Sequence, residues 1–241
     1  MPQTKEQIII ALDVDSKAKA LNLVHQLSPV VSWFKVGMEL FSAAGPDIVR
    51  EISSTGAKVF VDLKFHDIPN TVSKAGAAIT RLGAAMFNVH CSGGREMMTR
   101  TVELAKETAA REGLPITKII GVTVLTSMSE AVLNDEIGVF RGMAQQVEAL
   151  AVLAREAGMD GVVASPKEIA VIRKACGPQF LIVTPGVRPA WSATDDQHRI
   201  MTPQEAYELG ATHLVIGRPV TGAENPREAC EKIISEMEGN I

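Results

Sequence analysis

Short apolar stretches recur along the chain, and each is followed by a stretch with helical periodicity. A run of about four to eight apolar residues predicts a buried strand, and apolar residues spaced three and four apart predict an amphipathic helix. The expected strands are 8–12, 33–37, 59–64, 86–90, 119–125, 161–164, 180–184 and 213–216. The expected helices are 17–27, 41–54, 71–82, 96–111, a short one at 129–134, 143–157, 166–175, 203–209 and 226–237.

Eight strand-helix units in 241 residues predict a single-domain (β/α)₈ TIM barrel over residues 1–241. A doubly wound open sheet is the alternative. It is less favoured because no Gly-x-Gly-x-x-Gly turn follows the first strand. We find no linker and no low-complexity segment. In a barrel the active site lies at the C-terminal ends of the strands, so polar residues there are the first candidates for chemistry.

The overall charge and the apolar runs narrow the class of protein. A net charge of −4 without a cluster of basic residues argues against a general nucleic-acid binder. No apolar run approaches the roughly 20 residues that span a bilayer, and Ile8-Ile9-Ile10 is too short for a signal peptide. The three cysteines, Cys91, Cys176 and Cys230, lack metal-site spacing. We therefore expect a cytoplasmic protein with reduced thiols and no membrane contact.

The segment 59–71 changes from an apolar strand to a charged loop. Asp62 and Lys64 lie two apart, so on an extended strand they share a face while Leu63 points the other way. Pro69 suits the first turn of a helix, which places Asp67 in the connecting loop. A buried carboxylate and ammonium are costly unless they pair or act. Both a structural ion pair and a catalytic site fit this pattern.

Other charged residues also fall at expected strand ends. Asp13 follows the first strand and Lys35 lies in the second. Alone, Asp13 could cap a helix and Lys35 could extend to solvent. Together with Asp62 and Lys64 they would form an alternating ring of two carboxylates and two ammonium groups. For the histidines His66 and His90 we favour a structural hydrogen-bonding role.

Glycine and arginine recur after the last two strands. Pro185-Gly186-Val187-Arg188-Pro189 follows the seventh, and Gly217-Arg218-Pro219 follows the eighth. Loops at these two positions form a recurrent phosphate site in TIM barrels. Glycine lets backbone N–H groups approach an anion, and arginine supplies a permanent cation. The alternative is two turn glycines and two solvated arginines, and we favour phosphate.

The pattern Asp-x-Lys-x-x-Asp followed by Ile-Pro-Asn-Thr resembles the signature of the orotidine 5′-phosphate decarboxylase family. The stretches Asp13-Val14-Asp15 and Phe34-Lys35-Val36-Gly37 match that family too. The resemblance implies decarboxylation of orotidine 5′-phosphate to UMP and CO₂, the last step of de novo UMP synthesis. It also implies that no metal, flavin, thiamine or pyridoxal takes part.

The resemblance further assigns roles to residues. It implies that Lys64 protonates the substrate carbon and that Asp62, Asp67 and Lys35 complete the catalytic group. It implies substrate contacts from Asp13, Lys35, Ile68, Thr71, Thr126, Gly186, Arg188, Gln197, Gly217 and Arg218. In that family the aspartate matching Asp67 enters the active site of a partner subunit. The resemblance therefore implies a homodimer with shared sites. The loop 185–199 would be a lid over the phosphate.

Three rival hypotheses remain. A Mg²⁺-dependent sugar-phosphate decarboxylase or synthase of the same superfamily carries an acidic metal ligand where Lys35 stands, and a cation there would repel Mg²⁺. A Schiff-base aldolase using Lys64 needs a neutral amine, whereas flanking carboxylates favour the protonated one. A non-catalytic nucleotide-binding barrel would not need the complete ring of charges.

Overall fold

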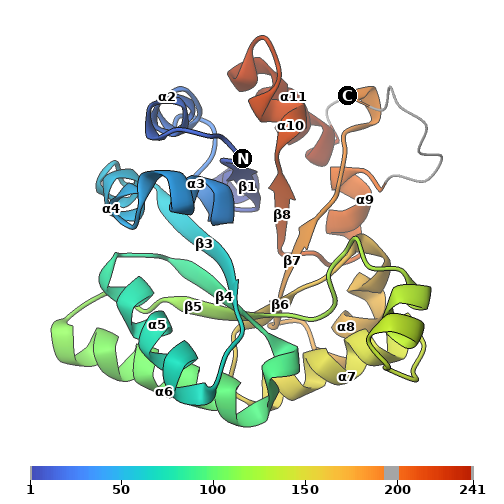
Figure 1. Ribbon diagram of the computed structural model, residues 1–241. Coiled ribbons are helices and arrows are strands. Elements are labelled where there is room, and N and C mark those ends of the chain that lie inside the picture. The colour runs from blue at the N-terminus through green and yellow to red at the C-terminus, as the bar shows by residue number, and fades with distance from the viewer. Residues whose placement is uncertain (1, 193–200, 240–241) are drawn as a thin grey trace.

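The chain folds into a closed barrel of eight parallel strands with helices around the outside (Figure 1). The computed structural model describes residues 2–192 and 201–239. The strands pair in chain order, and β8 closes on β1. They are β1 Ile8–Ala11, β2 Trp33–Gly37, β3 Lys58–Phe65, β4 Met86–His90, β5 Lys118–Val122, β6 Gly161–Val163, β7 Leu181–Pro185 and β8 His213–Ile216. The predicted single-domain TIM barrel is confirmed, and the open-sheet alternative is wrong.

Helices follow most strands and cover the barrel. They are α1 Pro2–Lys5, α2 Lys17–Leu27, α3 Met38–Ala44, α4 Asp47–Ser54, α5 Pro69–Arg81, α6 Gly94–Glu112, α7 Met143–Glu156, α8 Ile169–Cys176, α9 Pro203–Glu208, α10 Arg218–Thr221 and α11 Pro226–Met237. Short 3₁₀ turns occupy η1 Cys91–Gly93, η3 Pro166–Glu168 and η4 Ala190–Ser192, and η2 Val132–Glu136 is a π-helical turn.

The prediction of one helix over 41–54 was wrong, because the structure has α3 and α4 there. Gly45 has a φ of 72°, in the left-handed region, and Pro46 follows it directly before α4. A left-handed residue ends a helix, and proline lacks the N–H that would continue its hydrogen-bond ladder. The apolar spacing crosses this break without a change in period, so periodicity alone merged the two helices.

Two short helices and one turn differ from expectation. The four-residue helices α1 and α10 were not predicted, because one turn carries too little periodicity to recognise. The short helix expected at 129–134 is present, displaced toward the C-terminus as η2. Such shifts of a few residues are normal at helix boundaries.

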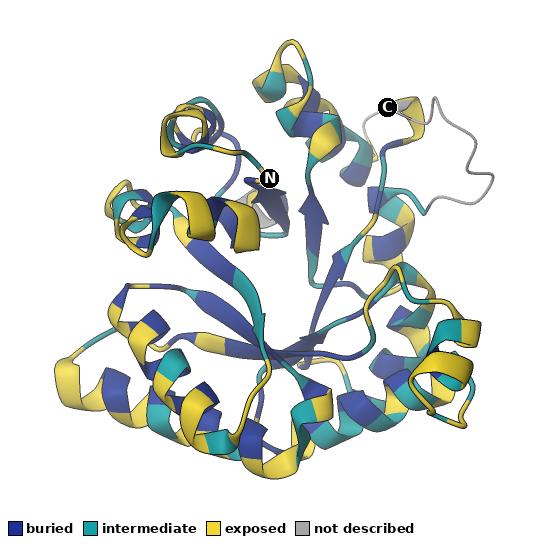
Figure 2. Cartoon of the chain, in the orientation of Figure 1, coloured by how far each residue is buried: buried dark blue, intermediate teal, exposed yellow. Residues whose placement is uncertain are grey.

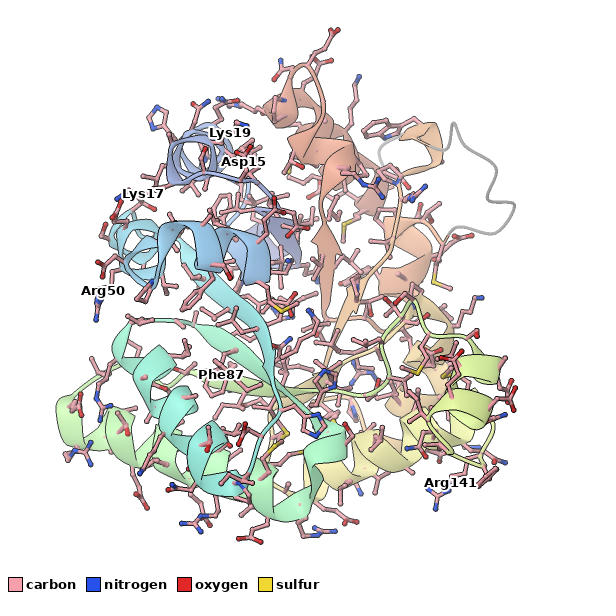
Figure 3. The ribbon with its side chains drawn as sticks, in the orientation of Figure 1. Asp15, Lys17, Lys19, Arg50, Phe87 and Arg141 are labelled. Atoms are coloured by element: carbon pink, nitrogen blue, oxygen red, sulfur yellow. The ribbon has the colours of Figure 1, made fainter. Side chains whose placement is uncertain are left out.

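The strands separate two apolar regions. The barrel interior is filled by side chains from alternating strand positions, namely Ile9, Ala11, Trp33, Phe60, Met86, Ile120, Val183 and Val215. A larger core lies between strands and helices, where Phe87 of β4 meets Gly76 of α5. Burial is accordingly concentrated in the strands and in the inward faces of the helices (Figure 2). Figure 3 places Phe87 inside this layer and Arg50 and Lys17 at the outer surface.

The period-two alternation inside the barrel also places polar residues at its mouth. Phe60, Trp33 and Met86 fill the interior, and two residues further along each strand stand Asp62, Lys35 and Asn88. Because side chains two apart share a face, these three follow the interior line of their strands. The C-terminal mouth is therefore polar directly above an apolar floor. No helix in the described ranges is long and apolar enough to cross a membrane.

Candidate active site

A cavity of about 770 Å³ opens at the C-terminal mouth of the barrel. Nine residues predicted from sequence line it, namely Asp13, Lys35, Asp62, Lys64, Thr126, Gly186, Arg188, Gly217 and Arg218. They lie in or after six different strands, β1, β2, β3, β5, β7 and β8. The barrel thus brings together residues that lie up to about 200 positions apart, as its closed topology requires.

Lys35 is the buried centre of one side of this cavity. It is 8% exposed, and its Nζ lies 2.9 Å from Oδ1 of Asp13 and 3.4 Å from Oδ2 of Asp62. Two carboxylates therefore compensate the buried ammonium group. Gly37 makes room for this arrangement, because a Cβ there would lie 2.9 Å from the Lys35 Nζ and 3.3 Å from Oδ1 of Asp13.

Asp62 accepts hydrogen bonds from two further groups. Lys64 Nζ donates to its Oδ1 at 2.7 Å, and Asn88 Nδ2 donates to the same oxygen at 2.7 Å. Burial raises the pKa of the Asp62 carboxyl. The positive charges of Lys35 and Lys64, together with these hydrogen bonds, lower the pKa by more than burial raises it. The net pKa lies below its ordinary value, so Asp62 is a carboxylate at neutral pH and both ammonium groups are paired.

The prediction that Lys64 follows Asp62 on one regular strand needs correction. Strand β3 continues one residue beyond the expected end, to Phe65, and its ladder with β4 shifts register between Val61 and Phe65. Lys64 has a φ of 51° and is the only non-glycine residue in the described ranges with positive φ. The predicted contact with Asp62 is present, although it arises from this irregular backbone. Strained backbone of this kind clusters at functional sites.

The candidate anion site lines the same cavity, after β7 and β8. Gly186, directly after β7, has a φ of 81°, which a residue with a side chain rarely adopts. Gly217 follows β8 and precedes α10, whose first residue is Arg218. Arg188 completes the set and is held by a hydrogen bond from its backbone N–H to the carbonyl of Met201. Permanent cations and backbone amides therefore line the same cavity as the two lysines.

Three predicted site residues, one catalytic and two substrate-binding, do not line this cavity. Asp67 and Thr71 are exposed, and the Ile68 side chain is 65% exposed. Asp67 Oδ1 accepts the backbone N–H of Ile68 at 2.7 Å, a local contact at the start of α5. Gln197 lies outside the described residues.

His66 and His90 lie side by side near the mouth, with ring centroids 5.4 Å apart. Burial lowers the pKa of His90, and the positive charges of His66 and Lys64 lower it further, against the opposing effect of Asp62. His90 is thus neutral at pH 7. The structural role of the two histidines stays a prediction.

Sequence reasoning missed two residues that shape the charged cluster, Asn88 and Gly37. Asn88 is the one polar side chain inside the otherwise apolar run 86–89, on the interior face set by Met86. That period-two position was the available signal. Gly37 had no comparable signal, because the need for an absent Cβ depends on where Lys35 and Asp13 meet.

The barrel and its charged cavity define a TIM-barrel enzyme in which paired lysines and carboxylates share one cavity with a candidate anion site. Residues 6–233 match the orotidine 5′-phosphate decarboxylase / HUMPS family, and the chain belongs to that family. The orotidine 5′-phosphate decarboxylase of Syntrophomonas wolfei is 56% identical, covering 98% of this chain and 99% of its own. That of Moorella thermoacetica is 53% identical, covering 97% and 93%.

A solved structure agrees with these relatives. The crystal structure of orotidine 5′-phosphate decarboxylase from Lactobacillus acidophilus has a TM-score of 0.85 and 38% identity, covering 96% of this chain and 99% of that one. The predicted resemblance and the predicted enzyme class, a decarboxylase of pyrimidine biosynthesis, are confirmed.

Proposed function

We propose that this enzyme converts orotidine 5′-phosphate to UMP and CO₂ without a metal or organic cofactor, with Lys64 as the proton donor to C6. The observation that carries the proposal is the Asp13–Lys35–Asp62–Lys64 array, whose successive contacts measure 2.9, 3.4 and 2.7 Å. The relatives named for this reaction support it over the whole chain. The array and the candidate anion site line one cavity of a size suited to a nucleotide.

The chemistry follows from where the charges lie. The bond between C6 and the carboxylate breaks, CO₂ departs, and the electron pair stays on C6. The Lys64 ammonium stabilises that developing carbanion and then transfers a proton to it, after which solvent reprotonates the amine. Stabilisation that is stronger in the transition state than in the ground state is what accelerates the step. The Asp62 carboxylate lies beside the departing carboxylate and favours its loss.

Binding of the substrate phosphate contributes further to catalysis. We assign the phosphate to Arg218, Arg188 and the backbone at Gly186 and Gly217, with Gln197 as a further ligand. Thr126, on the loop after β5, contacts the base. Binding energy from a group remote from C6 can support closure and orientation at the reacting carbon. The segment 185–199, of which 193–199 lie outside the described residues, is the proposed lid.

We propose a homodimer in which each subunit completes the partner's site with Asp67, Ile68 and Thr71. These residues are exposed in the single chain and do not line its own cavity. An exposed Ile68 side chain at the edge of an active site is suited to burial by a second subunit. In a two-fold symmetric dimer this exchange is reciprocal. We place the enzyme in the cytoplasm, where its three free cysteines stay reduced.

The Mg²⁺-dependent sugar-phosphate reaction is the rival to exclude. The Lys35 ammonium lies between Asp13 and Asp62, where a divalent cation would otherwise bind them. The deciding assay follows the loss of orotate absorbance in protein treated exhaustively with chelator. We expect full activity without added metal, and none in Lys64→Ala. Activity that appears only on adding Mg²⁺, or persists undiminished in Lys64→Ala, would refute the proposal.

A further inference from the structure

Asn88 is a fully buried polar residue beneath the charged array. It belongs to β4, is 0% exposed and has Met86 two residues before it on the interior face of the barrel. Its Nδ2 donates to Asp62 Oδ1 at 2.7 Å, and its Oδ1 accepts the backbone N–H of Lys64 at 2.8 Å. A buried amide needs such partners, since an unpaired donor or acceptor loses its hydrogen bonds to water and gains none in return.

The two bonds fix the orientation of the amide. The oxygen faces an N–H donor and the nitrogen faces a carboxylate, so a flipped amide would oppose oxygen to oxygen and N–H to N–H. The carboxamide of Asn88 is therefore a fixed bridge between the side chain of one active-site residue and the backbone of another.

The bond to Lys64 lies at the irregular part of β3. Between Val61 and Phe65 the ladder with β4 shifts register, and Lys64 in this interval has left-handed backbone geometry. A non-glycine residue in that region persists only where its surroundings enforce it. The side chain of Asn88 supplies an acceptor to β3 at the point where the regular strand pairing is interrupted.

The bond to Asp62 acts on the other end of the same ion pair. Asp62 Oδ1 receives both Asn88 Nδ2 and Lys64 Nζ, so the amide limits rotation of the carboxylate that the ammonium contacts. Asn88 thereby restrains the backbone of Lys64 and the partner of its side chain at once.

We propose that Asn88 is a positioning residue, which holds Lys64 in its left-handed conformation and sets the Asp62 carboxylate so that the ammonium group faces the substrate. This rests on the proposed role of Lys64 as proton donor. Asn88 itself does not contact the reacting atoms.

Two substitutions separate the two bonds. Asn88→Leu keeps the approximate volume and removes both bonds, and Asn88→Asp keeps the acceptor for the Lys64 N–H while replacing the donor to Asp62. Displacement of a reacting group by about 1 Å can lower the rate about 100-fold. We expect a fall in kcat of that order in Asn88→Leu, with KM changed less than about threefold, because the phosphate contacts are untouched.

The pH profile of Asn88→Asp is a readout that a merely structural role would not move. The introduced carboxyl faces Asp62 and Lys64 of β3, with Lys35 beyond Asp62 and His90 and His66 nearby. Once protonated, it can again donate to Asp62. We expect the ratio of its kcat to the wild-type kcat to rise as the pH falls from 8 to 6. An unchanged ratio would refute the part of the proposal in which the bond to Asp62 positions the carboxylate.

Thr101→Val is the matched control for loss of a buried hydrogen bond. Thr101 is 0% exposed and donates to the carbonyl of Met97 within α6, away from the cavity. We expect wild-type kcat in this variant. Folded Asn88→Leu enzyme with kcat within about twofold of wild type would overturn the proposal; if that variant does not fold, the profile of Asn88→Asp decides.

A crystal structure of the Asn88→Leu or Asn88→Asp variant distinguishes this proposal from the proposed function. Loss of the Lys64–Asp62 contact in Asn88→Leu would support the positioning role of Asn88. Absence of decarboxylation by wild-type protein would refute the proposed function and would leave that structural result standing. An unchanged Lys64 backbone and an intact contact in both variants would refute positioning while leaving the function standing.

Discussion

Lys64 Nζ donates a 2.7 Å hydrogen bond to Asp62 Oδ1 across an irregular stretch of β3, not along a regular strand. The pair is half-buried at the mouth of an apolar barrel, where an unpaired charge would be costly. Each group of the array therefore depends on the position of the next. Substitutions that displace one member without unfolding the barrel are the sharpest tests of the site.

Gly37→Ala should lower activity while leaving the fold intact. The added Cβ would lie 2.9 Å from Lys35 Nζ, the end of a flexible side chain that can move aside. Gly37 has a φ of −87°, so alanine adopts its backbone without strain and the free energy of unfolding should change by less than about 1 kcal/mol. We expect kcat to fall about 10- to 100-fold. The decarboxylation assay measures kcat, and denaturant unfolding of the same samples measures stability.

Gly45→Ala is the reciprocal control for that experiment. Gly45 has a φ of 72°, and a Cβ there meets nothing within 4 Å, so the substitution strains the backbone between α3 and α4 only. It should reduce stability by about 1 kcal/mol and leave kcat unchanged. Wild-type kcat in Gly37→Ala would contradict the importance assigned to the Lys35 position.

Arg218→Ala should mainly affect substrate that carries a phosphate. A hydrogen bond to a charged group is worth about 1.5–3 kcal/mol, so kcat/KM for orotidine 5′-phosphate should fall about 10- to 100-fold or more. Turnover of orotidine, which lacks the phosphate, should change less than about twofold. Arg50→Ala, which removes an exposed arginine of α4 paired with Asp47, is the control. Equal losses with both substrates would make Arg218 a structural residue.

Mixed dimers test whether Asp67 serves the partner's site. Lys64→Ala and Asp67→Ala chains, each inactive alone, are mixed under conditions in which subunit exchange is demonstrated. One site of each mixed dimer then lacks both residues and the other has both intact. Random pairing should restore about a quarter of wild-type activity. Mixing Lys64→Ala with the double variant is the negative control. No recovery from proven mixed dimers would place Asp67 in its own subunit's site.

His213 should make stability depend on pH in mildly acidic solution. Burial lowers the pKa of His213 to about 4, and the charges of Glu6 and Lys58 lie nearby. The ring centroids of His213 and Trp33 are 5.4 Å apart. The unfolded chain binds a proton at about pH 6.5, so stability is full above that pH and is lost as the pH falls toward 4. Between pH 7.5 and 5 the loss should be about 2 kcal/mol.

Denaturant unfolding of His213→Phe at those two pH values checks this expectation. The variant should lose that part of the pH dependence, whereas His25→Gln, which changes an exposed histidine of α2, should keep it. The pKa of Glu6 is below its ordinary value, so Glu6 titrates outside this range. Equal pH dependence in wild type and His213→Phe would refute the assignment.

The sequence by itself determined the barrel and most of the charged residues at its mouth. Eight apolar runs alternating with helical periodicity admit few folds, and the interior alternation from Phe60 to Asp62 and from Trp33 to Lys35 carries polar residues to one end. These are local properties, because side-chain direction on a strand follows from position alone. The family signature at Asp62, Lys64 and Asp67 is likewise contiguous in sequence.

Only the tertiary structure decided how the charged groups meet. The left-handed backbone of Lys64, the bridge formed by Asn88 and the space left by Gly37 all depend on contacts between neighbouring strands. Even the break between α3 and α4, which Gly45-Pro46 marks in the sequence, was hidden by apolar spacing that continues across it. Sequence patterns report which face a residue occupies, whereas hydrogen bonds and steric fit of a few tenths of an ångström require atoms from several strands to be placed together.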